Sequence, residues 1–146
     1  VLNYYRIIEF LNQSRYYLSR YFESVKEKKE IRLSLIYHHF DLNHIFVDQQ
    51  KLISIDQMKI NYCIYDLVEL FQNQKDLYEC VALFDGYLEE IDLYQEEKLL
   101  LLCLLSIVPH VSLNEDENNN IQEMAKLICY MDGIVKIFKK IEIDEV

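Results

Sequence analysis

Apolar residues recur every three or four positions along the first part of the chain. They are Tyr4, Ile7, Ile8, Leu11, Leu18, Tyr21, Phe22 and Val25. This spacing gathers apolar side chains on one side of a helix, while Arg15, Arg20 and Lys26 fall largely on the other faces. The pattern predicts a long amphipathic helix from residue 4 to about residue 28.

The pattern changes after this helix. Residues 31–37 form a short apolar stretch, and residues 45–47 are β-branched or aromatic. Residues 48–50 are polar, as in a turn, and residues 52–55 alternate as a strand does. We therefore expect a small β-hairpin. Its turn lacks the Asn-Gly or Asp-Gly pair that fixes the commonest hairpin register, so the sequence leaves the register open.

Helical periodicity returns in the second half of the chain. Apolar groups with this spacing occupy residues 66–71, 78–91, 95–108 and about 121–141. Pro109, the only proline, ends the third segment, because proline cannot continue a helix. The polar, acidic residues 114–120 are expected to form a loop, and Gly133 is expected inside or near a break in the last helix. The sequence thus predicts a mainly α fold of about five helices around one small β-hairpin.

The length fits a single domain covering residues 1–146. A chain of this size buries roughly two thirds of the surface that its unfolded form exposes. The longest apolar run, residues 99–108, is about half as long as a membrane-spanning helix, so we expect no membrane association. The start lacks an initiating Met and an export signal, and it also fits a piece cut from a longer chain.

Four cysteines, Cys63, Cys80, Cys103 and Cys129, lie far apart. None has the paired spacing that a zinc site or a dithiol redox centre requires. At least three fall in apolar helical stretches, which favours buried free thiols over a disulfide framework. Free thiols are typical of a reducing compartment, and we expect a cytoplasmic protein.

The net charge of −10 is unevenly distributed. Residues 66–97 contain ten acidic side chains and one lysine, whereas the first thirty residues contain six basic and four acidic ones. An acidic field repels phosphate backbones, so we expect no nucleic-acid partner. The twelve tyrosines and seven phenylalanines then favour a packed core or protein contacts, including self-association into a homo-oligomer.

Only two glycines, Gly86 and Gly133, occur in the chain. A Walker loop, a dinucleotide-binding fingerprint and a glycine-rich phosphate flap each require more glycines at short spacing, so all three are excluded. A serine nucleophile elbow is excluded for the same reason.

Three of the four histidines lie between residues 38 and 44. Imidazoles and a carboxylate this close can bind a metal, with His39, Asp41 and His44 as candidate ligands, but no recognised metal-site spacing is matched. A hydrogen-bonded loop is the favoured alternative. Asp56, expected at the end of the second hairpin strand, is either a functional carboxylate or a turn or capping residue.

The central stretch resembles a known family. It consists of Leu35-Ile36-Tyr37-His38-His39-Phe40-Asp41-Leu42-Asn43-His44-Ile45-Phe46-Val47-Asp48, then Lys51-Leu52-Ile53-Ser54-Ile55-Asp56, then Tyr65-Asp66-Leu67. It is similar to the kinase-like phosphotransferases that include aminoglycoside phosphotransferases, choline kinases and spore-coat kinase-like proteins. Their pattern is Leu-Ile-His-Gly-Asp-Leu-His-Pro-Gly-Asn-Ile-Leu-Val-Asp, a lysine-containing turn, a strand ending in Ile-Asp, and Tyr-Asp-Leu. The resemblance implies the C-terminal lobe of that fold, without the N-terminal lobe that supplies a phosphate-binding lysine and a flap.

Two alignments of the catalytic loop are open. Without a gap, His39 occupies the place of the family's catalytic aspartate and His44 that of its metal-binding asparagine. A shifted alignment keeps Asp41 as the base, but it places Phe46 at the asparagine and breaks the fit of residues 45–48. The asparagine is lost in both.

The resemblance also implies roles for two acids that match the family pattern. Asp56 corresponds to an aspartate that holds Mg²⁺, and Asp66 to one that braces the catalytic loop from a helix start. The candidate catalytic residues are therefore His39 and Asp41, the candidate metal ligands are Asp56 and His44, and Asp66 is a structural anchor of the loop.

Phosphoryl transfer needs metal ions and cations that neutralise the phosphates, together with a carboxylate that orients the nucleophile. The lost groups favour a catalytically inactive kinase-like C-lobe, a pseudokinase that acts as a binding or regulatory module without a cofactor. Two alternatives stay open. One is the C-terminal part of an active phosphotransferase that uses Mg-ATP, and the other is a helical interaction protein whose acidic face, residues 66–97, meets a basic partner.

Overall fold

The computed structural model describes residues 2–38, 45–53, 55–73 and 77–143. These residues form the helices α1 (Leu2–Val25), α2 (Ile64–Asn73), α3 (Leu77–Glu90), α4 (Gln95–Leu105) and α5 (Glu117–Phe138). Four short strands lie between α1 and α2. The predicted mainly α fold with about five helices and a small hairpin is confirmed for the described part of the chain.

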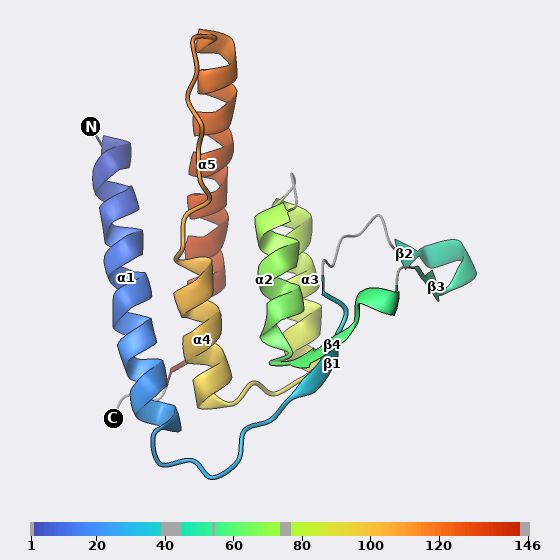
Figure 1. The fold of residues 1–146 in the computed structure, drawn as a ribbon. Helices are drawn as coiled ribbons and strands as arrows, with labels where there is room; N and C mark the ends of the chain where they lie inside the picture. Colours follow the sequence, from blue (N-terminus) through green and yellow to red (C-terminus); the bar gives the residue numbers. More distant parts are fainter. Residues whose placement is uncertain (1, 39–44, 54, 74–76, 144–146) are drawn as a thin grey trace.

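Helix α4 lies at the centre of the helical body, between α1 and α2 (Figure 1). Its apolar residues are buried around the whole circumference, from Leu99 to Cys103 and again at Leu105. A helix that is apolar on all sides is stable only when other elements cover every side. α1 and α2 pack against α4, and α3 packs against α2 and α5.

Helix α5 differs from the expectation at both of the predicted irregularities. Residues 117–120, expected in a loop, belong to the helix because Asp116 caps its start and accepts hydrogen bonds from the backbone N–H groups of Asn118 and Asn119 (3.0 and 3.4 Å). The helix also continues through Gly133 without a break. Capping satisfies backbone donors that a helix leaves unpaired, which outweighs the low helix propensity of the asparagines.

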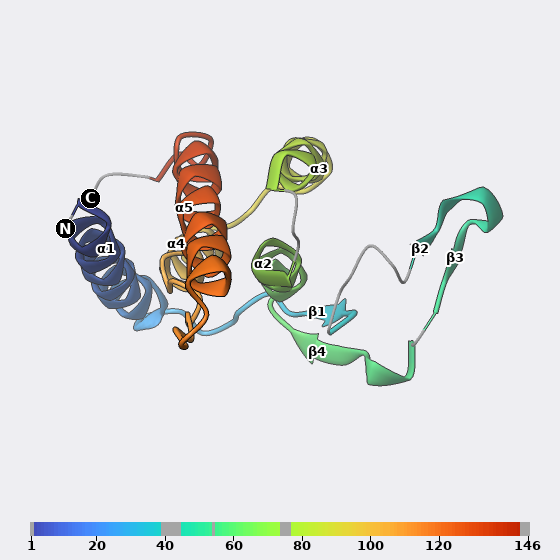
Figure 2. The same ribbon diagram turned by 90° about the horizontal axis from the view of Figure 1, so that it is seen from above.

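The hairpin is present, with β2 (Ile45–Phe46) antiparallel to β3 (Lys51–Leu52) and Ile45 opposite Leu52. Its turn contains a 3₁₀ segment, Val47–Gln49, followed by Gln50 at a φ of 49°. The second strand is shorter than predicted: β3 ends at Leu52, and Ile55 belongs to a further 3₁₀ turn, Ile55–Gln57. Figures 1 and 2 show the hairpin projecting from the helical body.

A second pair of strands was missed by the sequence pattern. β1 (Ser34–Ile36) is antiparallel to β4 (Lys59–Asn61), with Ser34 opposite Asn61 and Ile36 opposite Lys59. Each strand has only three residues, which is too short to show an alternation. The pairing closes the base of residues 37–58, which we call the excursion, beside the start of α2 (Figure 2).

Candidate functional site

The excursion contains four of the five predicted site residues, and the structure describes only one of the four. His39, Asp41 and His44 lie outside the described residues. Asp56 lies in the 3₁₀ turn Ile55–Gln57, not at the end of a strand as expected. Its carboxylate is exposed and accepts a hydrogen bond from the side-chain amide of Gln57 at 3.0 Å. Asp56 is therefore accessible to a ligand from solvent.

Asp66 fastens the chain at the beginning of the excursion. It lies in the first turn of α2 and is half-buried. One carboxylate oxygen accepts a hydrogen bond from the backbone N–H of Tyr37 (2.8 Å), and the other accepts one from the N–H of His38 (3.0 Å). Hydrogen bonds to a charged acceptor are each worth about 1.5–3 kcal/mol. The last two described residues before His39 are thus held by a single carboxylate.

His38 adopts an unusual backbone conformation that its side chain helps to hold. Its φ is 58°, in the left-handed region where glycine is favoured. The ring lies between α2 and β4, with Nδ1 3.2 Å from Oε1 of Glu69 and Nε2 3.0 Å from Nζ of Lys59. A lysine ammonium can only donate, so Nε2 accepts and Nδ1–H donates to Glu69. Contacts to two elements offset the cost of the strained φ.

A buried ion pair holds the chain further upstream, between α1 and β1. The Glu97 carboxylate is fully buried at the start of α4 and accepts two hydrogen bonds from the Arg32 guanidinium, the one from Nε measuring 2.9 Å. It also accepts the backbone N–H of Tyr94 at 2.8 Å. The guanidinium stacks on the Tyr94 ring, 4.0 Å from its centre. The hydrogen bond to Glu97 raises the pKa of Arg32 above its ordinary value.

Lys28 forms a second ion pair, with Glu96, the residue before Glu97. Its Nζ lies 2.5 Å from Oε2 of Glu96, whose side chain is almost completely buried. Buried carboxylates are stable only when paired and hydrogen-bonded. These pairs could not be predicted from the sequence, because the partners are separated by more than sixty positions. The network joins the end of α1 and the approach to β1 to the start of α4.

These contacts change the interpretation of the acidic stretch 66–97. Asp66, Glu96 and Glu97 bind backbone groups or basic side chains of the same chain. Asp85 forms an ion pair with Lys140. With Glu69, which contacts the His38 ring, five of the ten acids in the stretch have partners within the described part of the chain, and the stretch does not form one uninterrupted acidic face.

For the described cysteines the prediction of free thiols is confirmed, and the prediction of burial is right at Cys103 and wrong at Cys129. Cys103 is a buried free thiol, Cys63 is half-buried, and Cys129 is exposed. The side chain of Cys80 lies outside the described part. Among the described residues, no group of three or more His, Cys, Asp or Glu side chains is placed to hold a metal ion.

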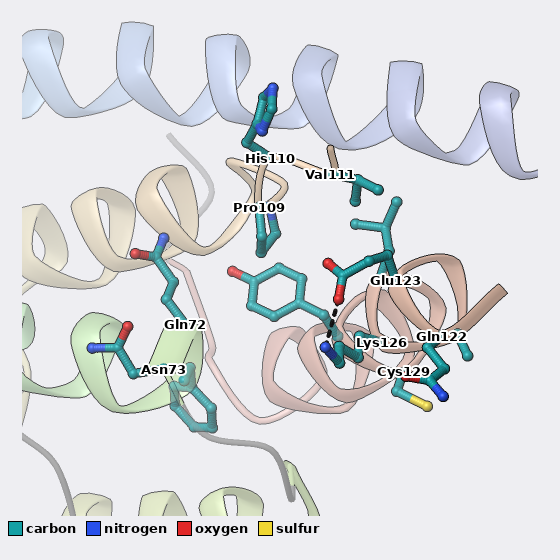
Figure 3. A pocket seen from close by; sticks show the side chains of 13 residues that line it. Gln72, Asn73, Pro109, His110, Val111, Gln122, Glu123, Lys126 and Cys129 are labelled. Atoms are coloured by element: carbon teal, nitrogen blue, oxygen red, sulfur yellow. Dashed lines mark hydrogen bonds and ion pairs between the residues drawn. The ribbon is translucent and has the colours of Figure 1, made fainter. Parts of the chain in front are cut away.

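A cavity of about 610 Å³ lies away from the excursion. It is formed by the end of α2, the connection between α4 and α5, and the first half of α5 (Figure 3). Phe71, Leu127 and Tyr130 contribute apolar walls, and the ion pair between Lys126 and Glu123 (2.5 Å) lies at its side. None of the predicted site residues lines it. The sequence offers no signal for it, because its residues come from three separate segments.

No described helix combines the length and apolar character needed to cross a membrane. Comparisons with protein-family models, curated proteins and solved structures found no match for this chain.

Proposed function

We propose that the chain is a catalytically silent, kinase-like C-lobe that acts as a binding or regulatory module. The observation that carries this proposal is the pair of hydrogen bonds from the Tyr37 and His38 N–H groups to the Asp66 carboxylate. The resemblance gives Asp66 the role of bracing a catalytic loop from a helix start. A carboxylate at the start of α2 that holds the residues just before the loop-like segment has the geometry this role requires.

The backbone of His38 supports the alignment without a gap. In that alignment His38 stands where the family pattern has the glycine of His-Gly-Asp. A φ of 58° at this position is the conformation that glycine adopts without strain. The shifted alignment would assign that glycine to Phe40, outside the described residues. The gapless alignment places His39 at the catalytic aspartate and His44 at the metal-binding asparagine.

Catalytic silence follows from the chemistry of these two exchanges. Imidazoles replace an anionic carboxylate and a neutral amide oxygen, which are the oxygen ligands and bases that Mg²⁺-dependent phosphoryl transfer uses. Asp56 is then the one acidic ligand of the pattern left at the site. One carboxylate does not hold Mg²⁺ and the phosphates of ATP in place.

Isothermal titration of the folded chain with ATP and MgCl₂ tests the silence. We expect no metal-dependent binding in the micromolar range and no phosphate release. Micromolar, Mg²⁺-dependent binding with turnover would remove the proposal in favour of an active phosphotransferase. In that event, Asp56→Asn should abolish binding, whereas Asp48→Asn, an exposed acid of the same excursion, should leave it unchanged.

Restoring the lost groups tests whether the segment has the kinase-like arrangement at all. The double variant His39→Asp/His44→Asn is expected to bind Mn²⁺ that the original chain does not bind, as measured by paramagnetic broadening of NMR signals from residues 55–57. Adding Asp56→Asn to the double variant should cancel the gain. If the double variant stays folded and gains no Mn²⁺ binding, the arrangement of these residues is not kinase-like.

A further inference from the structure

Helix α1 has two apolar faces, and among the described residues only one of them packs against the rest of the molecule. The inner face packs on the core through Ile7, Phe10, Tyr17 and Tyr21. Phe10 and Tyr17 contact the ring of Phe138 in α5. Figures 1 and 2 both show α1 at the edge of the molecule, with the other helices on one side of it.

The second face, which we call the outer seam, consists of Tyr4, Ile8, Leu11, Arg15, Leu18 and Phe22. The expectation that Arg15 lies on another face than these apolar residues is therefore wrong. Successive members are separated alternately by four and three positions, which is the a/d spacing of a coiled coil. The five apolar members are between 37% and 64% exposed, and Arg15 is exposed as well. A heptad seam in water is a contact surface that lacks its partner helix.

The seam is complementary to itself when two copies run in opposite directions. Around a midpoint at residue 13, Ile8 of one copy opposes Leu18 of the other, and Tyr4 opposes Phe22. Each residue at heptad position a then lies opposite a residue at position d of the other copy. Leu11, for example, lies opposite Arg15. We propose that the outer seam is a homodimer interface in which α1 pairs with α1 of a second copy in antiparallel orientation.

The polar groups of the seam fit this pairing. Asn12 and Ser19, which flank it on one side, carry no charge, so no like charges meet there. The stem of Arg15 can cover Leu11 of the partner while its guanidinium reaches water. The two Arg15 side chains lie near the two-fold axis, where their repulsion weakens the dimer as polar a residues do in coiled coils.

The size of the seam indicates a weak dimer. The exposed parts of its six side chains add up to roughly 500 Å² per copy, as large as the biggest apolar patch of a typical monomer. Two copies would bury roughly 1,000 Å², the lower limit for a specific interface. We therefore expect dissociation in the micromolar range. This proposal does not depend on the kinase-like function.

Sedimentation equilibrium over a range of concentrations tests the proposal. The original chain should dimerise, Leu11→Glu/Leu18→Glu should be monomeric, and Arg15→Leu should tighten the dimer at least tenfold. Leu83→Glu, at a similarly exposed position on α3, is the matched control and should leave dimerisation unchanged. Circular dichroism verifies that each variant is folded. A monomer at millimolar concentration, or a dimer that survives the double substitution, overturns the proposal.

Cross-linking tests the orientation. In a Cys129→Ser background, which removes the exposed thiol, an Ile8→Cys chain mixed with a Leu18→Cys chain should form a disulfide-linked dimer upon oxidation. Neither chain should cross-link with itself through the new cysteine, because positions 8 of the two copies lie roughly 15 Å apart along the helices. Cross-linking of the Ile8→Cys chain alone would indicate parallel helices and would contradict the proposal.

Discussion

Two kinds of contact hold the chain between the end of α1 and His38. At Arg32, a fully buried carboxylate is paired with a guanidinium across more than sixty positions of sequence. At Tyr37 and His38, a half-buried carboxylate binds backbone N–H groups that carry no net charge. Removing one partner of the first contact is strongly destabilising, because the other partner is left as a buried, unpaired charge. Removing the second contact should destabilise the fold less, because water can replace the carboxylate at the exposed side.

The largest expected effect is therefore at Arg32. Arg32→Met leaves Glu97 charged and buried without its main partner, and we expect a loss of about 3–5 kcal/mol in the free energy of unfolding. Urea denaturation measures it. The double variant Arg32→Met/Glu97→Leu removes both charges and should recover most of the loss. A single variant as stable as the original chain would show that the pair contributes nothing to the fold.

A smaller effect is expected at Asp66. Asp66→Asn keeps one oxygen acceptor but removes the negative charge, which should cost about 1.5–3 kcal/mol. Hydrogen exchange at the Tyr37 and His38 amides should accelerate more than exchange in α4, since the damage is local. Asp48→Asn is the matched control at an exposed position. Uniform acceleration throughout the chain would contradict the local role of Asp66.

Tyr130 provides an uncharged comparison at the other end of α4. Its hydroxyl donates to the buried backbone oxygen of Leu105 at 2.9 Å, and burial raises the pKa of Tyr130 above its ordinary value of 10.0. The unfolded chain therefore releases this proton first as the pH rises, so the stability contributed by the neutral phenol is present below pH 10 and is lost above it. Tyr130→Phe should cost about 0.5–1.5 kcal/mol near neutral pH.

The advantage of the original chain over Tyr130→Phe should shrink as the pH rises above 10. Stability measured by urea denaturation at several pH values checks this. A constant difference between the two chains across the alkaline range would rule out a raised pKa for Tyr130.

The smallest effect is expected at Lys126, whose ion pair with Glu123 is largely exposed. Lys126→Ala should change the free energy of unfolding by about 0.5 kcal/mol or less, and added salt should remove most of the difference. This variant gives the loss of stability for an exposed ion pair, with which the loss for Arg32→Met can be compared. A loss as large as that of Arg32→Met would mean that burial does not determine the strength of ion pairs in this molecule.

Helices that bury one side, such as α1, could be predicted from the sequence because burial of one side imposes a regular apolar spacing, whereas α4, buried on all sides, could be predicted from its long apolar run before Pro109. The start of α5 could not be predicted from that spacing, since Asp116 acts through the backbone. The β1–β4 pairing and the Arg32–Glu97 pair depend on groups brought together by the tertiary fold. The Asp66 carboxylate binds the backbone of Tyr37 and His38, whereas metal binding by Asp56 stays a prediction. The sequence pointed to both acids. It gave no sign of the left-handed backbone of His38 or of its contacts with Glu69 and Lys59.

The β1–β4 pairing brings the two ends of the excursion to one place, Ile36 lying opposite Lys59. Apart from the contacts of Tyr37 and His38 with α2, a change in length between these ends should therefore have little effect on the helical body. Lengthening such a loop twofold costs only about 0.6 kcal/mol in closure entropy. A foreign peptide inserted between Gln49 and Gln50 should thus leave the helices intact. The hairpin turn is therefore a suitable place to insert and display a foreign sequence.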